Sequence, residues 1–182
     1  MIERESEGAG FVLFSMGDDF VIRQATPRDV GEVSSVLTEV AGWLESRGQK
    51  LWVADELSPE KIQSEVTAGL YWITARGDEI VGCLRYQDAD PEYWDDVPHE
   101  DSSFVHRVAV RRKYAGKGLA RKMIEWAKNR ARDEGKRFLR LDCADRPKLR
   151  EVYEKMGFIF HSVKRRSPYN VIRYEFDLNK LD

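Results

Sequence analysis

The chain has 182 residues, of which 42% are hydrophobic and 34% charged. This length and composition suit one domain with one hydrophobic core and exclude a disordered or collagen-like chain. The 30 Lys and Arg against 32 Asp and Glu leave a formal net charge of -2. The whole molecule therefore lacks the positive field of a typical nucleic-acid binder, so we expect no nucleic-acid partner and only a local anion site.

No apolar run approaches the roughly 20 residues that span a bilayer. The run at residues 11–16 is short and follows three glutamates, which is the wrong charge for a secretory signal. We therefore expect a cytoplasmic protein with no membrane partner. Cys83 and Cys143 lack the spacing of metal ligands or of a disulfide framework, which predicts buried reduced thiols.

Residues 1–19 contain three glycines and no clear hydrophobic period. They predict an N-terminal extension holding at most one short strand, at residues 11–14. A single domain is expected over residues 20–182, beginning with a strand at 20–24. Helix-start signals at Thr26-Pro27 and at Ser58-Pro59 then predict a long helix ending near Gly48 and a shorter one ending near residue 68.

The second half of the chain predicts strands alternating with helices. Residues 70–76 and 79–86 flank Gly77-Asp78 and predict an antiparallel hairpin. Residues 88–101 hold two prolines and seven acidic residues without Lys or Arg, which predicts a loop. The remaining predicted elements are a strand at 103–110, a helix after Gly118, a strand at 137–143, a helix at 147–156, and strands at 158–163 and 171–178.

A helix connects the strands at 103–110 and 137–143, so these two strands are expected to be parallel. The hairpins at both ends of the chain are expected to be antiparallel. The predicted fold class is therefore α/β (α+β), with a mixed, mostly antiparallel sheet of about six to seven strands and helices on both faces.

The segment Gly116-Lys117-Gly118 joins a strand to a helix. The first amides of a helix have no partner within it, and glycines let a phosphate approach them closely, so this turn is a candidate pyrophosphate cradle. Residues 107–122 contain seven Lys or Arg and no acid. Leu119 departs from the nucleotide-triphosphate loop and Arg121 from the dinucleotide fingerprint. A simple tight turn with a solvated charged face is the alternative.

A second candidate segment is residues 149–158, where Tyr153 lies on the apolar face of a short helix. By pattern alone, Tyr153 is a core aromatic residue whose hydroxyl finds a partner. Together, Lys113-Tyr-Ala-Gly116-Lys-Gly118 and Tyr153-Glu-Lys-Met-Gly-Phe158 resemble two motifs of the GNAT superfamily of N-acetyltransferases. The resemblance covers about residues 20–178, including the order of elements.

Three features depart from the family pattern. Lys113 stands where Gln or Arg is usual, Arg146 where Asn is frequent, and residues 1–19 have no counterpart. Lys113 keeps a cation but loses a planar side chain.

The resemblance implies an acyltransferase that uses acetyl-CoA as cosubstrate and needs no metal. It implies that the parallel strands splay apart at the cofactor site. It also implies that Tyr153 is the general acid for the leaving thiolate and that the Val108 N–H stabilises the oxyanion. The implied cofactor-binding residues are Val108, Ala109, Val110, Lys113, Gly116, Lys117, Gly118, Leu119, Ala120, Arg121, Arg146 and Tyr153.

The sequence does not identify the general base, because the strand at 102–110 contains no carboxylate. The candidates are Glu100, His106, Asp101 and His99; for His106, a structural hydrogen bond is an equally good interpretation. Trp43, Trp52, Tyr93 and Trp94 are candidates for an acceptor pocket, with core packing as the alternative for each. The acidic loop at 88–101 is expected to attract a cationic acceptor.

We therefore predict an N-acetyltransferase that moves the acetyl group of acetyl-CoA to a primary amine of a small molecule or peptide by direct attack. One alternative is a sensor module that binds acyl-CoA or an amine without turnover. The other is a nucleic-acid binder that uses residues 107–122 and 164–166. A homodimer is compatible with the sequence, which does not identify the acceptor.

Overall fold

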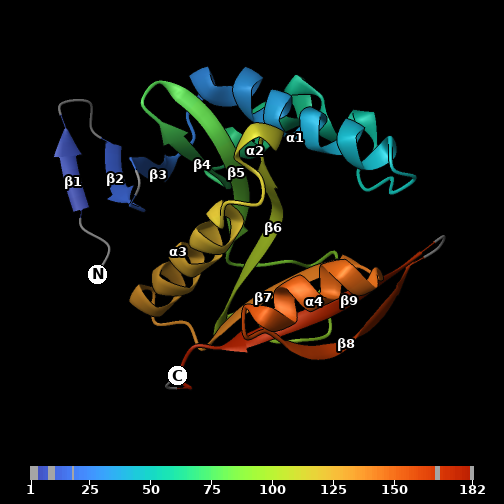
Figure 1. Ribbon diagram of the computed structural model, residues 1–182. Coiled ribbons are helices and arrows are strands. Elements are labelled where there is room, and N and C mark those ends of the chain that lie inside the picture. Colours follow the sequence, from blue (N-terminus) through green and yellow to red (C-terminus); the bar gives the residue numbers. More distant parts are fainter. Residues whose placement is uncertain (1–3, 8–10, 18, 167–168, 181–182) are drawn as a thin grey trace. The chain divides into compact units, whose positions relative to one another are not determined.

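The computed structural model describes residues 4–7, 11–17, 19–166 and 169–180, and Figure 1 shows their elements along the chain. The chain forms two compact units. Unit 1 contains Met1–Arg85 and Arg107–Trp126, and unit 2 contains Tyr86–His106 and Ala127–Asp182. The chain passes between the units three times, so neither unit is one continuous segment.

Unit 1 contains an antiparallel series of strands. These are β1 (Arg4–Glu7), β2 (Phe11–Ser15), β3 (Phe20–Gln24), β4 (Tyr71–Arg76) and β5 (Glu79–Gln87), whose last two residues enter unit 2. Each strand pairs with the next along the chain. The predicted hairpin is confirmed, with Gly77 at a φ of 56° in its turn. Strand β1 was not predicted, because Arg-Glu-Ser-Glu contains no apolar residue.

The two predicted helices of unit 1 begin at their predicted signals, Pro27 and Pro59, whereas the short η2 (Ala54–Leu57) was not predicted. The other helical segments before β4 are η1 (Pro27–Asp29), α1 (Val30–Glu45) and α2 (Pro59–Thr67). The apolar stripe of α1 contributes Val33 and Leu37 to a core that also holds Ile62 of α2 and Ile73 of β4, all with 0% exposure. Figure 1 shows α1 and α2 beside β4 and β5. Burial of these faces therefore fixes the helices on this sheet.

Unit 2 contains the parallel pair. Strands β6 (Ser102–Val110) and β7 (Phe138–Ala144) pair in parallel from Ser102↔Phe138 to Val105↔Leu141, as predicted. Strand β9 (Tyr169–Asp177) is antiparallel to β7, and β8 (Ile159–Arg166) is antiparallel to β9. Helix α4 (Pro147–Lys155) lies between β7 and β8 in the chain. The last four residues of β6 belong to unit 1.

Helix α3 (Leu119–Asp133) follows the short turn η3 (Arg112–Tyr114) and crosses from unit 1 into unit 2. In unit 1, the ring of Trp126 lies 4.6 Å from that of Trp72. In unit 2, Lys128 is buried, and its Nζ donates a hydrogen bond of 2.7 Å to the Met156 carbonyl. Both halves of α3 are therefore anchored by side chains of their own unit.

The predicted fold class is confirmed, since antiparallel pairing dominates and one parallel pair is present. The described residues form nine strands, and the two beyond the expected six to seven lie between residues 4 and 15. Cys83 and Cys143 are buried free thiols, as predicted. None of the helices in the described part of the chain is long and apolar enough to cross a membrane. The domain boundary at residue 20 stays a prediction.

Candidate active site

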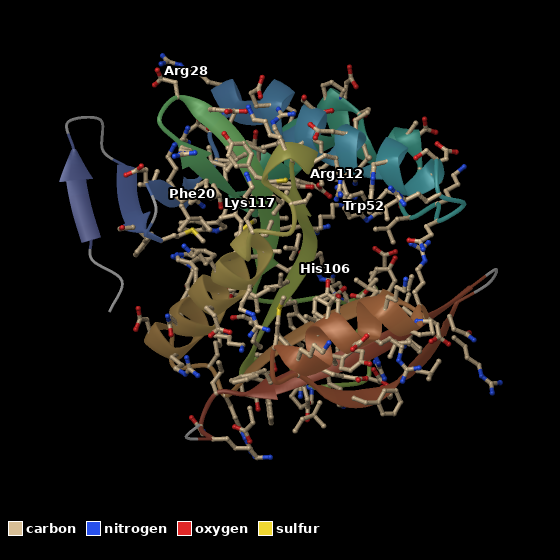
Figure 2. The ribbon with its side chains drawn as sticks, in the orientation of Figure 1. Phe20, Arg28, Trp52, His106, Arg112 and Lys117 are labelled. Atoms are coloured by element: carbon tan, nitrogen blue, oxygen red, sulfur yellow. The ribbon has the colours of Figure 1, made fainter. Side chains whose placement is uncertain are left out.

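Residues 115–118 form the turn before α3, which we call the glycine turn. Lys117, which lies in this turn, and Arg112, which precedes it, are labelled in Figure 2. Gly116 and Gly118 have left-handed φ angles of 77° and 80°, and a Cβ on either would meet no atom within 4 Å. The first helical bond of α3 runs from the Lys122 N–H to the Gly118 carbonyl at 3.1 Å. Among the described residues, no acceptor takes the amide protons of residues 116–120. The turn therefore offers consecutive free N–H groups beside open space.

Glu39 of α1 holds the segment that leads into the glycine turn. Its Oε1 accepts the Arg112 N–H at 2.6 Å, and its Oε2 accepts the Arg111 guanidinium at 2.8 Å. Burial opposes the negative charge, but these two hydrogen bonds outweigh it and lower the pKa of Glu39. The carboxylate therefore stays ionised and fixes the end of β6 on α1.

Lys113, a predicted cofactor ligand, is paired with an acid. Its Nζ lies 2.6 Å from Glu79 Oε1, while the Tyr114 hydroxyl donates to Glu79 Oε2 at 2.8 Å. The hydrogen bond from Lys113, followed by that from Tyr114, lowers the pKa of Glu79. The Lys117 ammonium lies 5.7 Å from the centre of the Tyr114 ring and forms no ion pair with a described residue. Of these two lysines, Lys117 is therefore the one whose charge is not already matched by a carboxylate.

The end of β6 supplies the other predicted cofactor contacts in unit 1. Ala109 is 2% exposed, whereas Val108 and Val110 are partly exposed. A Cβ on Gly82 of β5 would lie 2.9 Å from the Ala109 carbonyl oxygen and 3.3 Å from Met123 Sδ. Only glycine therefore allows this close packing of β5 against β6 and α3.

His106 lies between two carboxylates in unit 2. Its side chain is 12% exposed, with Nε2 3.1 Å from Asp90 Oδ2 and Nδ1 3.1 Å from Asp142 Oδ1. Burial would lower the pKa of His106, but the neighbouring carboxylates of Asp142 and then Asp90 outweigh it and raise the pKa to about 9. The ring is therefore an imidazolium at neutral pH.

The sequence did not point to either carboxylate. Asp90 is 2% exposed, and its Oδ1 accepts the N–H groups of Glu92 and Tyr93 at 3.1 and 3.0 Å. Burial opposes its charge, but His106 outweighs this and lowers the pKa of Asp90. One signal in the sequence could have pointed to Asp142. Arg140 and Asp142 alternate with leucines in a central strand, where charged residues are unusual.

One ligand atom each from Asp90, His106 and Asp142 lies within 4.8 Å of the others, a spacing that can hold a metal ion. However, His106 presents a different ring nitrogen to each carboxylate. Each carboxylate therefore forms its own ion-pair contact with the ring, and Gln87 Nε2 also lies 3.3 Å from His106 Nε2. The three groups together carry one net negative charge.

Tyr153 of α4 is only partly buried. Its ring lies 6.1 Å from that of Phe158 and 6.3 Å from that of Tyr174. Burial, followed by the nearby Cys143 and Asp142, raises the pKa of Tyr153, so the phenol keeps its proton. No described residue forms a hydrogen bond with its hydroxyl. The Tyr174 hydroxyl, in contrast, donates to Glu154 at 2.7 Å and accepts from Arg150 at 3.1 Å.

The other predicted bases lie in different surroundings. Glu100 is exposed, and its carbonyl oxygen accepts a bond of 3.2 Å from Lys136 Nζ. Asp101 Oδ1 accepts from the Ser102 hydroxyl at 2.8 Å, and His99 Nε2 lies 2.8 Å from the Trp94 carbonyl oxygen. His106 is thus the candidate that the structure places against two carboxylates, the buried Asp90 and the partly buried Asp142. Arg146 occupies the N-cap position of α4.

The acidic loop is tied to unit 2 by its own residues. Asp96 forms an ion pair with Arg173, and Asp95 forms one with Lys164. Trp94 has 0% exposure, with its ring 5.1 Å from that of His161. Trp94 is therefore a core residue and not part of an acceptor pocket. At least four of the seven acids already have a basic partner, since Asp88 pairs with Lys136 and Asp90 with His106. Tyr93 stays a candidate, because its ring lies 6.3 Å from that of His106.

The two unit 1 tryptophans that were candidates for the acceptor pocket have different surroundings. Trp52 packs, partly buried, against the core formed by α1 and α2. The Arg112 guanidinium lies 3.5 Å from the centre of the Trp43 ring, and that of Arg47 lies 4.7 Å away. Trp43 therefore supports the segment before the glycine turn. The glycine turn belongs to unit 1, while His106 and Tyr153 belong to unit 2, so their combination in one site stays a prediction.

Known proteins resemble this chain in sequence and in fold. A model of the acetyltransferase (GNAT) family matches residues 37–158. YesJ of Bacillus subtilis (strain 168), named as an uncharacterized N-acetyltransferase, is 29% identical over 153 residues, which cover 80% of this chain and 85% of that protein.

Two crystal structures illustrate the likeness in fold. A GNAT-family acetyltransferase from Listeria monocytogenes 4b F2365 has a TM-score of 0.73 and 21% identity, covering 90% of this chain and 99% of its own. The PaiA N-acetyltransferase from Thermoplasma acidophilum, in complex with coenzyme A, has a TM-score of 0.69 and 14% identity, covering 86% and 99%.

Proposed function

Because the chain belongs to the GNAT acetyltransferase family and is therefore an acyltransferase, we propose that it transfers the acetyl group of acetyl-CoA directly to a primary amine of a small molecule or peptide. The observation that carries this proposal is the glycine turn, whose free amides at residues 116–120 adjoin open space. Consecutive N–H groups at the start of a long helix are a favourable environment for a pyrophosphate.

Coenzyme A would be held by the residues around this turn. Of the amides at residues 113–121 that the resemblance implies, those of Tyr114 and Ala115 already donate to the carbonyls of Arg111 and Arg112. The free amides of residues 116–120 would therefore bind the pyrophosphate, and Lys117 would add a full positive charge. The backbone of Val108 and Val110 would hold the pantetheine, as the family resemblance implies. Partial exposure of both valines supports this role. The PaiA structure with coenzyme A shows that this fold accepts the ligand in a neighbour.

The chemistry proposed is one direct displacement. The neutral amine attacks the thioester carbonyl carbon, a C–N bond forms, and the C–S bond then breaks. The Val108 N–H donates to the oxygen that becomes negative in the transition state. Tyr153 gives its proton to the leaving thiolate. Its hydroxyl supports this assignment, because it is protonated at neutral pH and makes no hydrogen bond with a described residue, so its proton is available to donate.

The amine must lose a proton before or during attack, and we assign its removal to His106 in the neutral form. Glu100 and solvent are the alternatives. Since the pKa of His106 is raised to about 9, only a minor fraction of the ring can accept a proton at pH 7. The net negative charge of His106 with Asp90 and Asp142 favours an acceptor that arrives as an ammonium ion.

The test is a screen of primary amines with purified protein and acetyl-CoA, measuring steady release of free CoA. Binding of CoA without turnover of any amine would favour a sensor instead. Tyr153→Phe is expected to lower kcat about 10² to 10⁴-fold and to leave the Kd for CoA unchanged. Tyr174→Phe is the matched control, because its hydroxyl is already bonded to Glu154 and Arg150. Equal kcat in both variants would remove Tyr153 from the mechanism.

A further inference from the structure

One residue inside β6 has a backbone conformation that strands do not normally contain. Arg107 has a φ of 50°, in the left-handed region that side chains other than glycine rarely adopt. The peptide unit that follows it carries the Val108 N–H. The backbone angles of Arg107 therefore determine the direction of the N–H to which we assign the oxyanion.

The side chain of Arg107 is held by two buried groups of unit 1. Its Nη1 donates to the Tyr71 hydroxyl at 2.8 Å and to Glu65 Oε2 at 2.9 Å. Tyr71 at the start of β4 has 0% exposure, and Glu65 of α2 has 7%. Glu65 Oε1 in turn lies 3.2 Å from Arg85 Nη1. Two other elements of unit 1, α2 and β4, thus hold the strained residue through its guanidinium.

Buried ion pairs contribute little to stability compared with apolar packing, and a left-handed arginine is unfavourable in itself. Arg107 combines both features, and it directly precedes a residue assigned to catalysis. Strained backbone that is fixed by its surroundings is a common means of preorganising a site.

We propose that Glu65 and Tyr71 are positioning residues, which hold Arg107 in the left-handed conformation and thereby aim the Val108 N–H at the acetyl carbonyl oxygen. The inference rests on the proposed acetyl transfer. It assigns these two residues no contact with either substrate, so they should affect the chemical step and not the binding of coenzyme A.

The first test compares Tyr71→Phe with Arg85→Gln. Tyr71→Phe removes an acceptor from Arg107, whereas Arg85→Gln removes the other partner of Glu65 and leaves both acceptors of Arg107 in place. We expect Tyr71→Phe to lower kcat about tenfold with unchanged KM for acetyl-CoA, since small misplacements of catalytic groups are costly. Arg85→Gln should keep kcat within about twofold. Equal losses of kcat in both variants would overturn the proposal.

The second test changes residue 107 itself. Glycine adopts a left-handed φ freely, alanine less so, and a β-branched residue least. The expected order of kcat is therefore Arg107→Gly above Arg107→Ala above Arg107→Val, although all three lose the same hydrogen bonds. An Arg107→Gly variant no more active than Arg107→Ala would show that the backbone conformation is not what matters.

A readout independent of turnover separates this inference from the proposed function. In ¹⁵N-labelled protein, the Val108 amide resonance should shift and exchange its proton faster in Tyr71→Phe but not in Arg85→Gln. If the wild type transfers acetyl to no amine, the proposed function fails. The Val108 resonance in Tyr71→Phe and Arg85→Gln still shows whether Tyr71 controls the backbone at residue 108. An unmoved Val108 resonance in Tyr71→Phe would refute the positioning role.

Discussion

At the residue scale, the charge on His106 controls how the proposed reaction depends on pH. A histidine in water has a pKa near 6.5, and the two carboxylates next to His106 raise this to about 9. Below pH 9 the fraction of neutral imidazole falls about tenfold for each pH unit. A base with this pKa is therefore only weakly available under neutral conditions.

We predict that kcat rises with pH along a titration curve with its midpoint near 9. The acceptor in this measurement should have an amine pKa below about 6, so that the substrate itself does not titrate. His106→Gln should lower kcat at pH 9 and make the profile flat. If His106→Gln keeps the wild-type profile, Glu100 or solvent removes the proton, and Glu100→Gln decides between them.

Local motifs and long-range contacts were not equally visible in the sequence. His106, Tyr153 and the two glycines of the turn could be selected because each belongs to a short pattern with known chemistry. Asp90 and Asp142 could not, since they meet His106 only through the pairing of β6 with β7 and the return of the acidic loop. The positive φ of Arg107 had no signal at all, because nothing in the local sequence marks an arginine for that region.

At the element scale, the glycine turn can be tested against a turn of the same backbone conformation. Gly118 has a φ of 80° before α3, and Gly48 has a φ of 69° after α1. A Cβ at either position meets no atom within 4 Å. Alanine therefore imposes a similar backbone cost of about 1 kcal/mol or more at both positions, without a steric clash.

We predict that Gly118→Ala and Gly48→Ala lower the melting temperature to a similar extent, but that only Gly118→Ala weakens CoA binding. The reason is that the strained turn misdirects the amides of residues 116–120. Gly118→Glu should weaken binding further, because it adds a negative charge beside the proposed pyrophosphate site. Calorimetric titration of the folded variants provides the measurement. Unchanged affinity in Gly118→Glu would place coenzyme A elsewhere.

The elements themselves were largely predictable. Helix starts at Pro27 and Pro59 and the parallel pairing of β6 with β7 follow from caps, periodicity and connection length. Of the described strands, β1 is the one that was not predicted. Strand β1 pairs through its backbone with β2, from Arg4↔Phe14 to Glu7↔Phe11. Backbone pairing needs no particular side chains, so a polar strand has no hydrophobic pattern by which to predict it.

At the scale of the whole molecule, the chain links the two units at residues 85–86, 106–107 and 126–127. The glycine turn lies in one unit, whereas His106 and Tyr153 lie in the other. Covalent connection nevertheless keeps the α-carbons of His106 and Val108 within about 7 Å of each other, because they are two residues apart in β6. The proposed oxyanion donor and the proposed base are therefore neighbours through the chain itself.

Binding to the folded state alone must stabilise it by mass action. We predict that CoA at 100 times its Kd raises the free energy of unfolding by about 2.7 kcal/mol, which corresponds to a rise in melting temperature of about 5 to 10 °C for a chain of this size. The same concentration should not move the melting temperature of Gly118→Glu. A wild-type melting curve indifferent to CoA would contradict specific binding at the glycine turn.

The buried cysteines have a practical consequence for such experiments. Burial raises the pKa of both thiols to about 12, for Cys83 in the core of unit 1 and for Cys143 in β7. Since disulfide reagents react with the thiolate, the folded protein should contribute almost no colour to an assay that titrates liberated CoA with such a reagent. Unfolding exposes both sulfurs, and the same reagent then reports the loss of structure. One optical signal can thus follow turnover in the native protein and denaturation in the heated one.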